Sequence, residues 1–272
     1  CHHRGDMELT GKVVVVTGGA SGIGEAMCER FGVEGAAAVV VADQDDRKAA
    51  GVAARLSASG SRARAVRCDV ADEDQVVALV ERTEAEIGPI DLFCSNAGIA
   101  IGGGVEVPDA DWERIWRVNV MAHVYAARAL VPRMSVRGGG YLLATASAAG
   151  LLTNLGSAPY SVTKHAAVAL AEWLSITHAR EGIRVSCLCP QGVRTPMLLG
   201  GLDADEPSAA SVLAAGEMIE PTAVADAVVD ALAAERFLVL PHPEVALYER
   251  HRADDRERWL AGMRRLWDGM SE

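Results

Sequence analysis

Short runs of β-branched and small apolar residues alternate with amphipathic segments along most of the chain. Residues 13–16 form one such run, which ends at a Thr-Gly-Gly turn, and residues 38–42 form a second, which ends at Asp43. A fully apolar run of this length is typical of a strand buried on both faces of a parallel sheet. Between the two runs, Ile23, Met27 and Phe31 recur at helical spacing. This pattern predicts the order strand, glycine turn, helix, strand.

The alternation continues to about residue 240. Further strands are predicted at residues 65–68, 92–95, 141–144, 184–189 and 237–240, and helices at about residues 73–87, 109–134, 160–180 and 222–234. Seven strands alternating with helices predict an α/β fold, a single doubly wound Rossmann domain with a seven-stranded parallel sheet and helices on both faces. No second substrate domain is expected within the residues that follow 240, because they are too few.

Two segments fall outside this alternation. Residues 197–220 are rich in Gly, Ala, Ser and acids, and such a long connection is typical of a lid. Residues 244–272 form a C-terminal helical extension, in which Trp259, Met263, Leu266 and Trp267 share one face. The favoured interpretation is that this face packs on its own core or on a neighbouring subunit, and the alternative is a direct role in closing the substrate site.

The N-terminal residues are set apart from the domain. Residues 1–6 resemble an expression-tag remnant ahead of a natural start at Met7, because no apolar segment of a signal peptide follows them. The expected division is therefore a remnant at 1–6, the Rossmann domain at 7–243 with its lid, and the extension of the same domain.

Composition excludes several classes of function. The chain has 26 Lys+Arg against 37 Asp+Glu and a formal net charge of −11. Affinity for polyphosphates comes mainly from Lys and Arg contacts, so binding to nucleic acid or to an anionic membrane is not expected. The longest stretch without Asp, Glu, Lys or Arg, at residues 138–163, contains five glycines and a proline, which argues against a membrane-spanning helix.

The six cysteines are scattered without the spacing of metal ligands, so no metal site is predicted and a reducing, cytoplasmic location is expected. Cys187 and Cys189 flank a single leucine and would share one face of a strand.

The glycine-rich turn TGGASGIG at residues 17–24 places Gly18, Gly22 and Gly24 between a predicted strand and a predicted helix. Glycines let the backbone approach a pyrophosphate, whose charge is held by free amides and by the positive end of the helix dipole. An acidic protein can therefore bind this anion without basic side chains.

Acidic residues after two of the strands indicate which dinucleotide is bound. Asp43 lies 19 residues after Gly24, where a carboxylate accepts hydrogen bonds from the adenosine ribose and repels a 2′-phosphate. The turn also lacks an Arg or Lys to pair with that phosphate, so NAD is favoured over NADP; the alternative is that Asp43 only caps the next helix. Asp69 is assigned to the adenine amino group or, alternatively, to an ordinary turn.

Tyr160 and Lys164 are four residues apart and project from one face of a predicted helix. Lowering a tyrosine pKa from about 10 toward neutrality requires about 4 kcal/mol of differential stabilisation of the phenolate. A nearby ammonium and an oxidised nicotinamide can supply it. Ser147 lies 13 residues earlier, at the strand edge where doubly wound sheets bind ligands. Its hydroxyl is predicted to hold the substrate oxygen while Tyr160 moves the proton.

These residues, with several others, resemble the short-chain dehydrogenase/reductase family in its shorter, NAD-dependent type. The resemblance covers about residues 9–240. It is carried by the TGGASGIG turn, CDV at 68–70, NAG at 96–98, Asn119 in RVNV, Ser147, YSVTK at 160–164 and PQGVRTPM at 190–197.

The resemblance implies a role for each matching residue. Tyr160 is the general acid/base, and Lys164 binds the nicotinamide ribose and lowers the tyrosine pKa. Ser147 orients the substrate oxygen, and Asn119 holds a water of the proton relay. Asn96 and Gly98 line the cofactor floor, while Val193 and Thr195 bind the nicotinamide carboxamide. The other cofactor contacts it implies are Ser21, Ile23, Gln44, Val70, Ala97, Pro190 and Gly192, and family habit implies a homotetramer.

Two departures from the family pattern matter. Gln191 follows Pro190 where many members have glycine, which weakens the assignment of backbone contacts there. The chain also ends unlike the ketoreductases of fatty-acid synthesis, because a charged helix follows the last strand.

The substrate side is defined by apolar residues near the catalytic positions. These are Ile99, Ala100, Ile101, Leu151, Leu152, Leu155, Met197, Leu198 and Leu199, although several of them can equally pack the lid on the body. The expected function is an NAD-dependent oxidoreductase that transfers a hydride between an apolar secondary alcohol or ketone and the nicotinamide. The alternatives are an NADPH-dependent carbonyl reductase and a non-catalytic NAD-binding regulatory protein.

Overall fold

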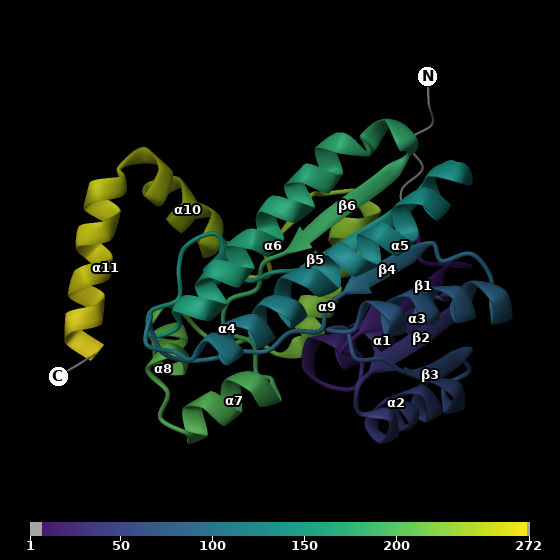
Figure 1. Cartoon of the computed structure of the whole chain (residues 1–272), viewed down its shortest axis with the longest axis horizontal. Coiled ribbons are helices and arrows are strands. Elements are labelled where there is room, and N and C mark those ends of the chain that lie inside the picture. Colours follow the sequence, from purple (N-terminus) through teal and green to yellow (C-terminus); the bar gives the residue numbers. More distant parts are fainter. Residues whose placement is uncertain (1–6, 271–272) are drawn as a thin grey trace.

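Parallel strands form the centre of the molecule. The computed structural model describes residues 7–270, so the remnant assigned to residues 1–6 lies outside the described part of the chain. Within it, the strands are β1 (Val13–Thr17), β2 (Ala38–Asp43), β3 (Ala63–Arg67), β4 (Leu92–Ser95), β5 (Gly140–Thr145), β6 (Ile183–Leu188) and β7 (Leu238–Val239). They form one seven-stranded sheet in the order β3-β2-β1-β4-β5-β6-β7 (Figure 1). The order reverses between β1 and β4, where open α/β sheets bind their ligands.

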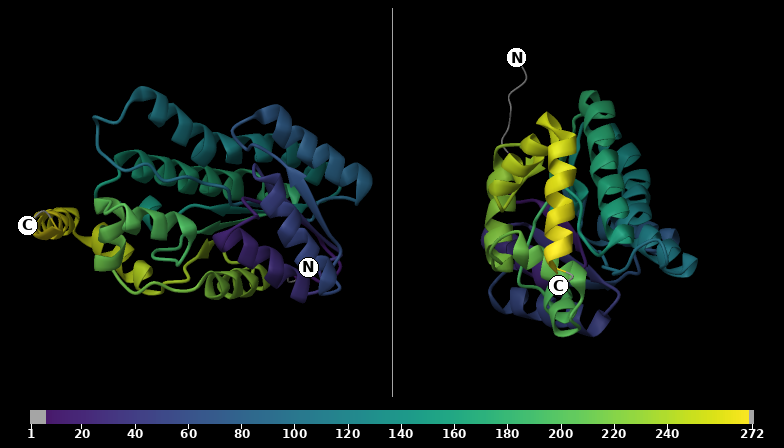
Figure 2. Two further views of the ribbon diagram at one scale, coloured as in Figure 1. Left: turned by 90° about the horizontal axis from the view of Figure 1, so that it is seen from below. Right: turned by 90° about the vertical axis from the view of Figure 1, so that its left-hand side faces the viewer.

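Helices cover both faces of this sheet (Figure 2). Helices α1 (Gly22–Val33), α2 (Asp46–Ala58) and α9 (Pro221–Ala233) pack on one face, and α3 (Glu73–Glu86), α5 (Ala122–Val136) and α6 (Ala158–Thr177) pack on the other. All five residues of β1 are buried, as the unbroken apolar run requires of a strand covered on both faces. The predicted fold class is confirmed.

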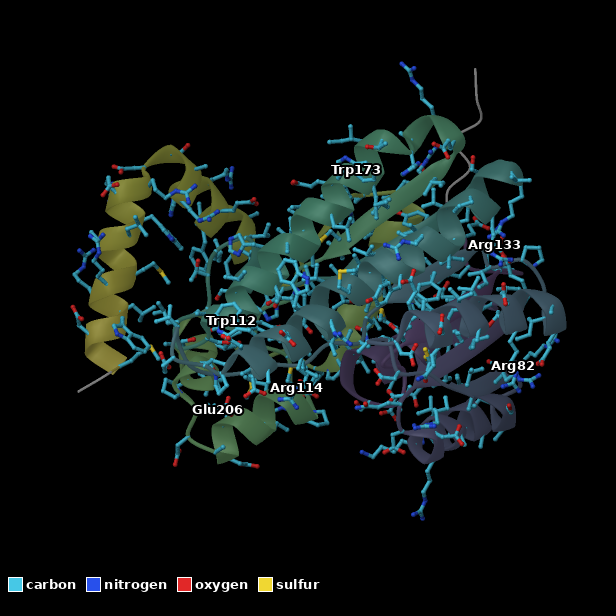
Figure 3. The ribbon with its side chains drawn as sticks, in the orientation of Figure 1. Arg82, Trp112, Arg114, Arg133, Trp173 and Glu206 are labelled. Carbon is cyan, nitrogen blue, oxygen red and sulfur yellow. The ribbon has the colours of Figure 1, made fainter. Side chains whose placement is uncertain are left out.

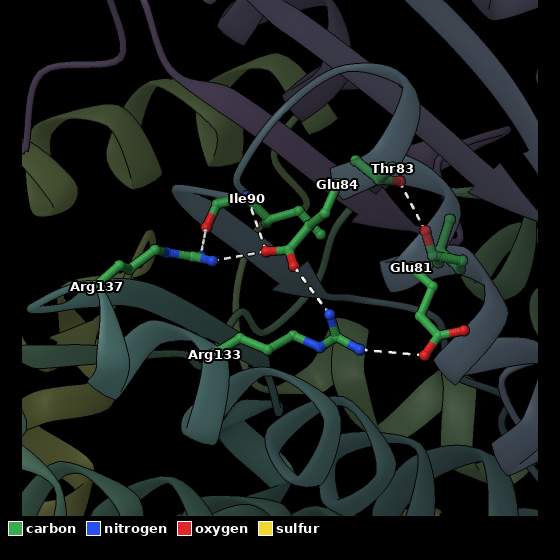
Figure 4. Close-up of polar contacts among 7 residues, drawn as sticks. Glu81, Thr83, Glu84, Ile90, Arg133 and Arg137 are labelled. Carbon is green, nitrogen blue, oxygen red and sulfur yellow. Dashed lines mark hydrogen bonds and ion pairs between the residues drawn. The ribbon is translucent and has the colours of Figure 1, made fainter.

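A group of ion pairs holds α3 against α5 and the start of β4 (Figure 4). Glu84 accepts hydrogen bonds from Arg137 at 2.6 Å, from Arg133 at 3.2 Å and from the Ile90 N–H at 3.4 Å. Arg133 also bonds Glu81 at 3.2 Å. The Glu84 side chain is 17% exposed. These contacts therefore join α3 and α5 through a largely buried carboxylate.

The structure differs from the predicted elements in three places. Helix α2 was not predicted individually, although the alternation requires a connection there. The helix predicted over residues 109–134 is divided into α4 (Asp109–Trp116), a π-helical turn at Arg117–Met121, and α5. The segment predicted as a lid contains α7 (Pro196–Asp203) and α8 (Pro207–Ala214), each starting at a proline in its first turn.

The C-terminal residues form α10 (Glu244–Asp254) and α11 (Arg256–Met270). Helix α11 stands beside the body rather than on it (Figures 1 and 2), and none of its described residues is buried. It therefore does not pack on the core of its own sheet. No helix within residues 7–270 is both long enough and apolar enough to span a bilayer.

Candidate active site

A cleft of about 280 Å³ lies at the carboxyl ends of the strands on either side of the switch point. Most of the residues assigned to the cofactor line it, namely Gly18, Ser21, Gly22, Ile23, Gly24, Asp43, Gln44, Asp69, Val70, Asn96, Ala97, Gly98, Tyr160, Lys164, Pro190 and Thr195. Gly192 and Val193 do not line it. Cys68, Val118, Thr145 and Ala146 line it as well, although none of them was assigned to the cofactor. Ile99, which was predicted for the substrate side, lines this cleft instead.

The glycine turn has the shape of a cradle for a pyrophosphate. Gly18 has a φ of +62° and Gly22 a φ of +55°, conformations that strongly favour glycine. A Cβ on Gly18 would lie 2.9 Å from the Cα of Ala97, and one on Gly24 would collide with the carbonyl oxygen of Gly18. Ser21, the N-cap of α1, makes no side-chain capping bond. The first turn of α1 lines the cleft, and no side chain of its N-cap occupies its amides, so they can hold a phosphate there.

Asn96 joins the end of β4 to this turn. Its Nδ2 donates to the carbonyl oxygen of Thr17 at 3.0 Å, and its backbone N–H donates to the Thr17 hydroxyl at 2.9 Å. Asn96 thus fixes the floor of the cleft on both sides of the switch point.

The Asp43 carboxylate connects β2 to the glycine turn. It accepts from the N–H of Ala20 at 3.1 Å and from the N–H of Asp45 at 3.0 Å. The cap of α2 is Asp45, whose side chain accepts from the N–H of Lys48. The alternative that Asp43 only caps the next helix is therefore wrong.

Asp69 serves a turn and also lines the cleft. Its Oδ1 accepts from the N–H of Ala71 at 3.0 Å, as expected of an ordinary turn residue. Because the same residue lines the cleft, the two assignments made for it are compatible.

Ser147, Tyr160 and Lys164 converge at one side of the cleft. Ser147 is hydrogen-bonded to the hydroxyl of Tyr160, and its own hydroxyl lies 3.3 Å from the Pro190 carbonyl oxygen. Lys164 is 3% exposed, and its Nζ lies 5.5 Å from the centre of the Tyr160 ring. Nζ donates to the Thr145 carbonyl oxygen at 3.0 Å, which holds the ammonium beside the cleft.

Burial acts on both titratable members of this group. It raises the pKa of Tyr160, although the hydrogen bond from Ser147 works in the opposite direction. It lowers the pKa of Lys164 to about 8, against the opposing influence of the thiols of Cys189 and Cys187. These thiols lie 3.8 Å apart, which confirms that they share a face of the strand. Low-dielectric surroundings disfavour the charged form of each group.

Asn119 does not line the cleft. It is fully buried in the π-helical turn. Its Oδ1 accepts from the N–H of Ile99 and its Nδ2 donates to the Ile99 carbonyl oxygen, both at 2.9 Å. A π-turn inside a helix often marks a functional position, and here it places Asn119 where its carboxamide holds the loop that follows β4.

His242 holds the backbone of residues 190–192, the segment that departs from the family pattern. Its Nδ1 accepts from the N–H of Gln191 at 3.2 Å, which leaves Nε2 to donate to the Gly192 carbonyl oxygen at 3.1 Å. His242 is 3% exposed. It fixes the turn beside Ser147, and no sequence motif had identified it.

A second cavity of about 180 Å³, here the inner cavity, adjoins the cleft. Tyr160 lines both spaces, as do Pro190 and Thr195, whereas Ser147 lines the inner cavity alone. Of the residues proposed for the substrate side, the inner cavity includes Ala100, Leu152, Met197 and Leu198. Val193, assigned to the cofactor, lines this cavity instead. Within the described residues, no group of three or more His, Cys, Asp or Glu side chains is placed to hold a metal ion.

A doubly wound sheet with a glycine cradle at its switch point, and a Ser-Tyr-Lys group beside that cradle, defines a nucleotide-binding oxidoreductase. The chain belongs to the short-chain dehydrogenase family, because the family described as short chain dehydrogenase matches residues 12–203. It is an oxidoreductase of the class that acts on CH–OH groups.

The relatives have different substrates and cofactors. The chain is 38% identical to 1-deoxy-11-beta-hydroxypentalenate dehydrogenase of Streptomyces exfoliatus over 253 residues, which cover 92% of this chain and 90% of that protein. A short chain dehydrogenase/reductase from Burkholderia phymatum, solved in complex with NAD, superposes with a TM-score of 0.84 at 31% identity and covers 92% of this chain and 95% of its own. L-sorbose reductase from Gluconobacter frateurii, complexed with NADPH and L-sorbose, has a TM-score of 0.77 at 29% identity, with coverage of 86% and 95%.

Proposed function

We propose that this protein is an NAD-dependent dehydrogenase of apolar secondary alcohols, and that Tyr160 is its general acid/base. The observation that carries the proposal is that Tyr160 lines both the cleft and the inner cavity. A proton-transfer group must reach the atom that loses or gains the proton, and this position borders the spaces for both reactants. A non-catalytic NAD-binding protein would not require the buried lysine and the serine beside that phenol.

The residues divide the reaction between them. A bound dinucleotide supplies the hydride acceptor. Ser147 presents its hydroxyl to the substrate oxygen from the inner cavity and keeps its hydrogen bond to Tyr160. Tyr160 takes the proton of the substrate hydroxyl. Lys164, held by the Thr145 carbonyl, favours the phenolate by its positive charge. Asn119 and His242 fix the two backbone segments, at Ile99 and at Gln191, that border the site.

The choice of NAD rests on Asp43. Its carboxylate lines the cleft beside the glycine turn, where a 2′-phosphate would bring two negative charges together. None of the described residues that line the cleft, apart from Lys164, is a Lys or Arg. An NADPH-dependent reductase would need a cation for the extra phosphate; the L-sorbose reductase from Gluconobacter frateurii was solved in complex with NADPH.

The test is a steady-state comparison of NAD⁺ and NADP⁺ with a series of secondary alcohols. We expect kcat/KM with NAD⁺ to exceed that with NADP⁺ by at least tenfold, and Asp43→Asn to reduce the ratio while keeping an acceptor for one of the two amides. Tyr160→Phe should lose activity by a factor of a hundred or more. Preference of the wild type for NADP⁺ would refute the cofactor assignment, and an active Tyr160→Phe would refute the mechanism.

We further propose a homotetramer in a reducing cytoplasm, with one domain over residues 7–243 and its extension. Trp173 lies on α6, where Figure 3 labels it. It is 56% exposed, and Trp116 on α4 is 41% exposed; large aromatic residues are enriched at subunit interfaces. The five cysteines within residues 7–270 are free and buried, which suits a reducing compartment. Sedimentation equilibrium would test the tetramer.

A further inference from the structure

Two more spaces adjoin the inner cavity on the side of α11. The middle cavity, of about 250 Å³, lies between Leu152 and Ala215 of the body and Tyr248, Trp259 and Met263 of the C-terminal helices. The outer groove, of about 1270 Å³, lies between the segment around Leu155 and the face of α11 that carries Trp259, Leu260 and Met263.

The three spaces are neighbours, because each shares lining residues with the others. The inner and middle cavities share Leu152, Thr153, Ser211 and Ala215, and the middle cavity shares Thr153, Leu155, Trp259 and Met263 with the outer groove. Thr153 lines all three and has a φ of +130°. A β-branched residue rarely adopts this conformation, and such strain tends to occur at functional sites.

The sizes of the spaces restrict the substrate. The inner cavity of about 180 Å³ holds about six water molecules, whereas pockets that bury a drug-sized ligand measure roughly 300–1,000 Å³. A substrate larger than a six-carbon alcohol must therefore extend past Thr153. Beyond Thr153 lies α11, an amphipathic helix none of whose described residues is buried. Its apolar face is therefore exposed to a substrate that extends that far.

The residues between the inner cavity and the outer groove restrict the charge of the substrate. Thr153, Asn154, Ser157 and Glu206 line both the inner cavity and the outer groove, and Glu206 lies on the segment before α8 (Figure 3). These four shared residues are polar, and none of them is a Lys or Arg. This lining can pass a neutral chain, and its carboxylate disfavours an anionic one.

We propose that α11 is part of the substrate site, and that the middle cavity and outer groove bind the distal apolar part of a neutral secondary alcohol or ketone with more than about six carbon atoms. This inference rests on the proposed function and specifies its substrate class. Trp259 and Met263 line both outer spaces and are specificity-determining residues. They contact the tail of the substrate and not its reacting carbon.

The test is a ladder of 2-alkanols from 2-butanol to 2-decanol, oxidised with NAD⁺ and followed as NADH. For the wild type we expect kcat/KM to keep rising beyond 2-hexanol, by up to about fourfold per methylene. Trp259→Ala and Met263→Ala should each lower the ratio of kcat/KM for 2-decanol to that for 2-butanol by tenfold or more, and Trp259→Phe should restore part of it. Arg258→Ala, an exposed residue of the same helix outside these linings, should keep the wild-type ratio.

The outcomes separate the two proposals. A wild type that oxidises short alcohols but shows no gain beyond 2-hexanol overturns the inference and leaves the proposed function intact. Failure to oxidise any alcohol on the ladder or to reduce the matching ketones counts against the proposed function itself. If Trp259→Ala lowers all rates equally and reduces the sedimentation mass, a second copy of the chain occupies the groove, and the inference is wrong.

Discussion

Replacement of Lys164 by methionine should make the protein more stable while it destroys activity. The ammonium is 3% exposed and has the Thr145 carbonyl oxygen as a hydrogen-bond partner at 3.0 Å. Burial lowers its pKa from 10.5 to about 8. Folding at pH 7 must therefore carry the cost of a poorly compensated buried charge, which methionine, of similar length, removes.

The pKa gives the size of this cost. A shift from 10.5 to about 8 corresponds to about 3 kcal/mol, since one unit is about 1.4 kcal/mol. Loss of the charged hydrogen bond to Thr145 offsets about 1.5 kcal/mol of the gain. A net gain of about 2 kcal/mol in the free energy of unfolding should raise Tm by roughly 4–8 °C in a chain of this size.

The pH dependence provides an independent check of the sign. Because the pKa is lower in the folded state, the unfolded chain binds more protons between about pH 8 and pH 10.5, and the stability of the wild type rises with pH across that window. By pH 9.5 the free energy of unfolding of the wild type has risen by about 2 kcal/mol. The higher stability of Lys164→Met should therefore vanish at that pH.

Thermal unfolding of both proteins without cofactor, at pH 7 and pH 9.5, measures these differences. Lys48→Met, whose side chain is 70% exposed, is the matched control and should leave Tm nearly unchanged. A lower Tm for Lys164→Met at pH 7, with native circular dichroism, would refute the reasoning, as would an advantage that persists undiminished at pH 9.5.

Three further substitutions test other parts of the structure. Gly24→Ala should lower Tm by several degrees and abolish the stabilisation by NAD, because the new Cβ would meet the Gly18 carbonyl. Gly51→Ala in α2 is the control; the nearest atom to its Cβ would be 3.9 Å away, so it should be neutral or slightly stabilising. Glu84→Gln should cost about 2 kcal/mol of unfolding free energy at pH 7. Burial raises the pKa of Glu84, but its bonds to Arg137, the Ile90 N–H and Arg133 outweigh this and lower it from 4.5, so urea titrations should show the difference fading as pH falls below 4.5. Ser147→Ala removes the hydrogen bond that lowers the pKa of Tyr160, so the acid limb of kcat/KM for alcohol oxidation should move to higher pH, and an unmoved limb would contradict that role.

The sequence was sufficient to predict the parts of the fold that depend on local patterns. The unbroken apolar run at β1 required cover on both faces, and the glycine turn after it required a close approach of backbone, which Gly18 makes to Ala97. The four-residue spacing of Tyr160 and Lys164 correctly placed both on one face of α6. Such features depend on short stretches of chain and on the steric needs of single residues.

Other features depend on contacts between residues distant in sequence. His242 reaches Gln191 and Gly192 across about fifty positions, and nothing around it in the sequence indicates that contact. The π-helical turn that carries Asn119 interrupts a segment whose apolar spacing is that of a continuous helix. The position of α11 could not be derived either, because an amphipathic face predicts that something covers it and not what covers it.

The surroundings of Tyr160 and Lys164 impose opposite requirements on one small volume. Burial favours the neutral phenol and the neutral amine alike, whereas a phenolate base with an adjacent ammonium needs both groups charged. Ser147 and the Thr145 carbonyl each contribute a hydrogen bond toward the charged forms, but burial is the larger influence on both pKa values. Formation of the charged pair therefore requires a further source of positive potential at the phenol. The proposed dinucleotide, in its oxidised form, carries positive charge on the ring that the adjacent cleft would hold, so cofactor binding and activation of the base would be coupled in this site.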